Sequence, residues 1–64
     1  MTLEQWKKKL EPHLTAVHGV LSVEVGKVGL TVCVAKITKT VQDGVYDVFE
    51  NFAAELPFMI KPMN

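Results

Sequence analysis

The sequence predicts an α+β fold: a two-layer α-β-β-α-β sandwich in which two helices pack on one face of a three-stranded sheet. Three observations support this prediction. Apolar residues recur at helical spacing in residues 3–17 and 41–56. Two runs with strand-like alternation lie next to each other between them, and a short apolar run follows a proline near the C-terminal end. At 64 residues, the chain is expected to form one small domain, residues 1–64.

The first helix is expected over residues 3–17. Thr2 and Gln5 form a capping box at its start, in which each side chain bonds to the backbone of the other residue. Pro12 lies inside this segment, where proline removes a backbone donor at a cost of about 3 kcal/mol. We therefore expect a kink or a break near residues 9–11. The apolar residues at helical spacing are Leu3, Trp6, Leu10, Leu14 and Val17.

A β-hairpin is expected next, over residues 21–34. Gly19 precedes it and suits a left-handed cap at the end of the first helix. Apolar residues alternate on both sides of Gly26-Lys27, and a two-residue turn with glycine first suits type II′ geometry. Inward-facing pairs would then be Val25 with Val28, Val23 with Leu30, and Leu21 with Val32.

A second helix is expected from Thr40 to the residue before Pro57, with Thr40 and Asp43 as a cap-like start. Gly44 inside it costs up to about 1 kcal/mol unless another backbone passes close by. Residues 58–61 then form a short edge strand with Phe58 and Ile60 inward. If this strand neighbours the second one, the crossover is right-handed and the two strands are parallel. The apolar stripe of the helix comprises Val41, Val45, Val48, Phe49, Phe52, Ala53 and Leu56.

The predicted arrangement leaves the other face of the sheet without helices. On that face the second strand presents Thr31, Cys33 and Ala35, which are small and uncharged, whereas a solvated antiparallel face normally carries more charge. Such a surface lets a second sheet or helix approach closely. The chain is also short, and its single cysteine excludes an intramolecular disulfide, so self-association is the remaining common way to stabilise it.

These features predict a non-catalytic protein-interaction module that self-associates and acts as an inhibitor or adaptor by masking a partner surface. Replacing Cys33 with arginine is expected to leave the monomer folded and to abolish association. The acidic side of the second helix is a further candidate docking patch. The candidate interaction residues are Thr31, Cys33, Ala35, Met59, Lys61, Asp43, Asp47 and Glu50.

The chain offers no set of residues for catalysis or for metal binding. His13 and His18 are five residues apart, not the three or four that place two ligands together on a helix. Cys33 lies mid-strand, with no helix N-terminus to activate it as a nucleophile. Nothing in the sequence would desolvate one of the helix carboxylates as a general acid requires. We therefore expect neither an enzyme nor a cofactor.

Charge and hydropathy predict the partner class. Seven lysines balance seven acidic residues, with a net +3 in residues 1–39 from six lysines and three glutamates, and −3 in residues 40–64. The run Lys7-Lys8-Lys9 fans around its helix, so it does not form a stripe for nucleic acid. No apolar stretch approaches the ~20 residues of a membrane span, and no secretory pattern appears. We expect a cytoplasmic protein with a protein partner, without nucleic acid or membrane binding.

The run Gly19-Val20-Leu21-Ser22-Val23-Glu24-Val25 after a helix, followed by strand, helix and strand, resembles the later part of a heavy-metal-associated domain of the ferredoxin-like type. The first strand and the Met-x-Cys-x-x-Cys loop of that family are missing, so copper handling is not implied for this chain. The element order is also similar to that of BON domains, which are associated with membranes or envelopes, although their glycine pattern is not matched. The alternative function is thus a small-ligand or metal carrier of truncated ferredoxin-like architecture, with a pocket between the helices and the sheet.

Overall fold

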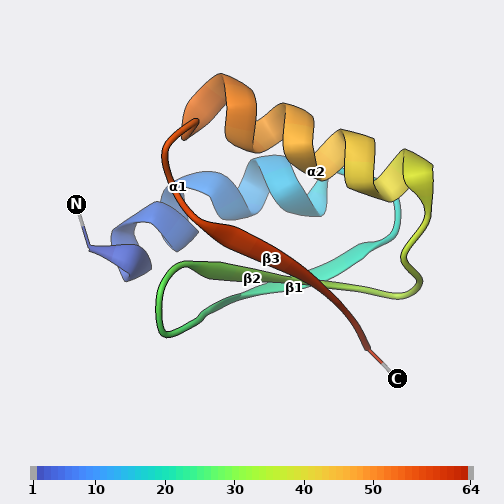
Figure 1. Cartoon of the computed structure of the whole chain (residues 1–64), viewed down its shortest axis with the longest axis horizontal. Coiled ribbons are helices and arrows are strands. Elements are labelled where there is room, and N and C mark those ends of the chain that lie inside the picture. The colour runs from blue at the N-terminus through green and yellow to red at the C-terminus, as the bar shows by residue number, and fades with distance from the viewer. Residues whose placement is uncertain (1, 64) are drawn as a thin grey trace.

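The computed structural model describes residues 2–63 and shows the predicted α+β class, with the elements in the order α-β-β-α-β. Figure 1 shows both helices on one side of the sheet, which leaves the other side without a covering helix. β2 is the central strand, paired antiparallel with β1 and parallel with β3, so the expected crossover between parallel neighbours is confirmed. The elements are α1 (Leu3–Thr15), β1 (Val20–Val25), β2 (Leu30–Val34), α2 (Lys39–Phe52) and β3 (Phe58–Pro62).

The start of α1 is the predicted capping box. The Gln5 backbone N–H donates to Thr2 Oγ1 at 3.2 Å, and the Thr2 N–H donates to Gln5 Oε1 at 2.9 Å. Of the kink or break expected near residues 9–11, the break is wrong, because the helix continues through Pro12 to Thr15. Leu10 and Leu14, on either side of Pro12, are fully buried, and their packing offsets the missing hydrogen bond.

The chain then turns into β1 through Gly19, whose φ of 100° confirms the predicted left-handed conformation. The residue is not the helix cap, because α1 ends at Thr15, two residues before the expected end. Gly19 instead occupies the third position of a turn closed by the Val20 N–H and the Val17 carbonyl at 3.1 Å. Positive φ at that position is characteristic of a type II turn.

The predicted turn of the hairpin is wrong by one residue. The Gly26 N–H donates to the Gly29 carbonyl at 2.7 Å, so Lys27 and Val28 occupy the tip, and Gly26 does not adopt the positive φ of a type II′ turn. Val25 therefore pairs with Leu30 and Val23 with Val32. Because each partner moves by two residues, the inward face is preserved for Val23, Leu30 and Val32, which are buried, whereas Val28 is 82% exposed.

A bulge in β1 overturns the predicted pairing of Leu21 with Val32. The register shifts between Val20, which pairs with Val34, and Ser22, which pairs with Cys33. Leu21 is the extra residue, so it does not pair with Val32 and does not enter the core, and 53% of it is exposed. The alternation of β1 is thereby interrupted.

The second helix begins and ends earlier than predicted. Thr38, rather than Thr40, is the N-cap, and its Oγ1 accepts from the Val41 N–H at 3.2 Å. The helix ends at Phe52, because the chain must turn and become extended before Pro57. At Gly44 it is the Val17 side chain rather than a backbone that comes close, with Cγ1 2.7 Å from where a Cβ would lie.

The core lies between the helices and the sheet, and its centre on α2 differs from the predicted stripe. Val41, Val45 and Phe49 are buried, and the Phe49 ring stacks on Phe58 of β3 at 3.9 Å between centroids. Phe52, predicted inward, is 44% exposed and stacks instead on His13 of α1 at 4.3 Å. The buried cluster comprises Leu10, Leu14, Val23, Leu30, Val32, Val34, Val41, Val45, Phe49 and Ala53.

Candidate interaction surface

The face of the sheet that points away from both helices, here called the open face, contains the five sheet residues of the sequence prediction. Val32 and Val34 belong to the helix-side core, so the alternating residues of β2 lie on the open face. The pairings arrange the open face in two rows across the strands. One row is Glu24, Thr31 and Met59, and the other is Ser22, Cys33 and Lys61, with Ala35 just beyond β2.

The open face has a small, uncharged centre between longer side chains. Cys33 is only 2% exposed although no helix covers it, and it lies between Ser22 of β1 and Lys61 of β3. The thiol donates to Glu24 Oε2 at 3.7 Å, which holds this carboxylate over the sheet. Met59 on the opposite edge strand is 61% exposed. The face therefore combines apolar contact area with two charges, one at each edge.

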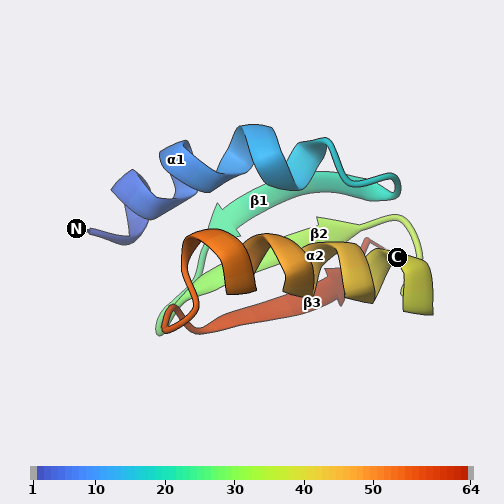
Figure 2. The same ribbon diagram turned by 90° about the horizontal axis from the view of Figure 1, so that it is seen from above.

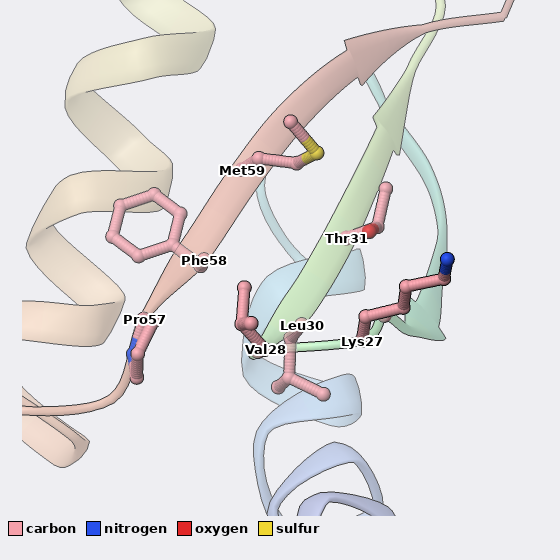
Figure 3. Close-up of a pocket in the computed structure, with 9 residues that line it drawn as sticks. Lys27, Val28, Leu30, Thr31, Pro57, Phe58 and Met59 are labelled. Atoms are coloured by element: carbon pink, nitrogen blue, oxygen red, sulfur yellow. The ribbon is translucent and has the colours of Figure 1, made fainter.

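A cavity of about 240 Å³ lies at the hairpin end of the open face. Figure 3 shows it between the turn residue Val28 and the start of β3, from which Phe58 projects toward α2 and Met59 to the other side. Its lining is mainly apolar, and Lys27 and Thr31 contribute the polar side chains. This cavity lies between the turn and β3, away from the space between the helices and the sheet where a ligand pocket was predicted.

The backbone contact between Gly29 and Pro57 forms the floor of this region. A Cβ at Gly29 would lie 2.0 Å from the Pro57 carbonyl oxygen, so only glycine fits there. The same carbonyl accepts from the Leu30 N–H at 3.1 Å and thereby begins the pairing of β2 with β3. Glycine at position 29 therefore positions both the cavity and the edge strand.

Two exposed apolar residues were missed by the sequence prediction, which placed both in the core: Val28 in the turn and Leu21 at the opposite end of β1. The signal for Val28 was the symmetric placement of Gly26 and Gly29, which brackets a two-residue tip at Lys27-Val28. No comparable signal marks Leu21, because a bulge depends on how the partner strand is held.

The acidic residues Asp43, Asp47 and Glu50 are exposed on α2, whose buried side faces the sheet. The structure does not bring them together with the open face, because the helices and that face lie on opposite sides of the sheet (Figure 1). The predicted candidate residues therefore belong to two separate surfaces. The open face combines the exposed Met59 side chain with a neighbouring cavity.

Residues 2–63 contain no group of three or more histidine, cysteine or acidic side chains that could hold a metal ion. Over the same part of the chain, neither helix has the length and apolar character needed to cross a membrane. The open face offers the Cys33 thiol, the Glu24 carboxylate, the Lys61 ammonium group and the Met59 thioether. Comparison with protein-family models, with curated proteins and with solved structures found no significant match to this chain.

Proposed function

We propose that this chain is a non-catalytic protein-interaction module that self-associates through the open face. The observation that carries the proposal is the centre of that face: Cys33 is buried without a helix above it, and Met59 stands exposed beside it. Contact with another protein would bury Met59 and the neighbouring apolar side chains. Each fully buried side chain of this size contributes about 1.5–3 kcal/mol.

The two edges of the sheet are less suited to association. β1 carries the bulge at Leu21, and α1 runs alongside it (Figure 2). β3 has only five residues and contains Lys61 and Pro62, and short strands with lysine and proline are typical of edges protected against pairing. The centre of the open face, formed by Thr31 and Cys33, carries neither a charge nor a proline.

Met59→Glu is expected to convert a self-associated species into a monomer. A carboxylate buried at the interface without a partner is costly, so the dissociation constant should rise at least about tenfold. The measurement is mass by light scattering over a dilution series, with the wild type approaching twice the 7.1 kDa chain mass. Met59 is preferable to Cys33 for this test, because Cys33→Arg also introduces a bulky cation at a buried position.

Ile37→Glu is the matched control, since Ile37 is 40% exposed and lies in the connection between β2 and α2. It should leave the mass unchanged, and circular dichroism should show both variants folded. A wild type that stays monomeric at its highest soluble concentration would overturn self-association. Equal effects of the two variants would overturn the assignment to the open face. If the wild type is monomeric, the open face would instead be a docking site for a different protein, as in the predicted masking role.

A second candidate function, carriage of a small apolar molecule, is supported by the cavity beside Val28. Its volume of about 240 Å³ suits a single ring rather than a drug-sized ligand. Toluene added to labelled protein should shift the amide resonances of Gly29, Thr31 and Met59, and Val28→Trp should abolish the shifts by filling the space. Shifts spread over the whole chain, or unchanged in the variant, would count against carriage.

A further inference from the structure

The two charges of the open face lie at opposite edges and in different rows. Glu24 is on β1, in the row of Thr31 and Met59, whereas Lys61 is on β3, in the row of Ser22 and Cys33. The rows are two residues apart, about 7 Å along the strand. The hydrogen bond from Cys33 keeps the Glu24 carboxylate over the face, so its charge is presented to anything that packs there.

Two symmetric arrangements keep the strands of two stacked open faces aligned. A two-fold axis across the strands and midway between the rows places β1 over β1 and β3 over β3, so the two Glu24 residues lie one row apart on one side and the two Lys61 residues one row apart on the other. An axis along the strands places β1 of one copy over β3 of the other. Each row then faces the same row of the second copy, so Glu24 lies over Met59 of that copy, one row from Lys61. Because Cys33 holds the Glu24 carboxylate toward the row of Lys61, the carboxylate approaches Lys61 of the second copy twice by symmetry. Charge complementarity selects the second arrangement.

The central strand is compatible with this arrangement. With the axis along β2, the small side chains Thr31 and Cys33 of the two copies face each other. The sheets can therefore approach closely at the centre, and the exposed Met59 side chains are buried on either side. Burial at the centre with charges at the rim is the usual anatomy of a protein interface.

We infer that the partner of the open face is a second copy of this chain, related by a two-fold axis along the strands, with Glu24 of each copy paired with Lys61 of the other. This inference rests on the proposed function and adds to it the partner and the orientation. The charges at the rim determine the orientation of the two copies, whereas the small, uncharged centre lets their sheets approach closely.

Charge reversal tests the arrangement. Glu24→Lys and Lys61→Glu each place like charges opposite each other at two symmetric positions, so each should weaken the dimer at least about tenfold. The double variant restores both pairs in reversed order and should return the dissociation constant to near the wild-type value. Glu50→Lys and Lys39→Glu on α2 are the matched controls and should change it little. Sedimentation equilibrium measures all five proteins and the wild type.

The outcomes separate this inference from the proposed function. One result would overturn the two-fold arrangement and leave the interaction module standing. In it, Met59→Glu disrupts the dimer, but either the two single charge reversals do not weaken it or the double variant does not restore it. A wild type that is monomeric throughout would overturn both. Thermal unfolding of each variant checks the fold, and Lys61→Glu remains informative if Glu24→Lys unfolds through loss of the contact with Cys33.

Discussion

Phe49→Ala is expected to remove a large part of the protein's stability at 25 °C. The Phe49 ring is buried at the centre of α2 and stacks on Phe58, so its removal opens a cavity between the helix and the edge strand. Such a truncation costs about 3–5 kcal/mol. A 64-residue domain has a total stability of only about 3–10 kcal/mol. Urea unfolding followed by circular dichroism measures the difference.

Phe52→Ala is the matched control on the same helix. Phe52 is half-exposed and packs against the His13 ring, a contact of the kind that contributes about 0.5–1.5 kcal/mol. The control should therefore remain folded with a modest loss of stability. Equal losses in the two variants would show that the core is not centred on Phe49.

Gly29→Ala is expected to have the second largest effect. The new methyl group would meet the Pro57 carbonyl oxygen, which is backbone and has no rotamer to move away. The hydrogen bond from the Leu30 N–H to Pro57 must lengthen or break, so β3 separates from β2 at its first residue. Overpacking of this kind costs about 1–3 kcal/mol, and more when backbone must shift. In thermal unfolding, the Tm should fall by about 4–8 °C for each kcal/mol of stability lost.

Gly26→Ala provides the comparison at the other end of the turn. A Cβ there would lie 3.0 Å from the Gly29 carbonyl oxygen and 3.1 Å from Thr31 Oγ1, distances that small adjustments relieve. Its loss of stability should be clearly smaller than that of Gly29→Ala. The opposite order would mean that the turn, and not the contact with Pro57, sets the requirement for glycine at position 29.

Much of the fold could be predicted from the sequence, because its strongest signals are local. The capping box at Thr2 and Gln5 involves residues three apart, and the two strand-like runs reveal their inward faces through alternation alone. Val32 and Val34 are buried as predicted, and the open face follows directly from them. The parallel pairing of β2 with β3 followed from the order of the elements.

The errors lie where a distant part of the chain decides the local conformation. Gly29 looked like an ordinary strand position, but it is held against Pro57, 28 positions further along the chain. Thr38 rather than Thr40 caps α2, and both satisfy the same local rule. The interaction role of the open face is of the same kind, since it depends on a partner that the sequence does not contain.

The parallel pairing of β2 with β3 has a consequence for how the protein folds. Leu30 and Phe58 are direct partners, so the loop between them includes all of α2 and must close before the pair can form. Pairing between α1, β1 and β2 needs only short loops. We infer that folding ends with the docking of β3, and that a nascent chain without residues 58–62 leaves the backbone of its central strand unpaired on one side. The docking of β3 thus determines when this sheet becomes safe from strand-to-strand aggregation.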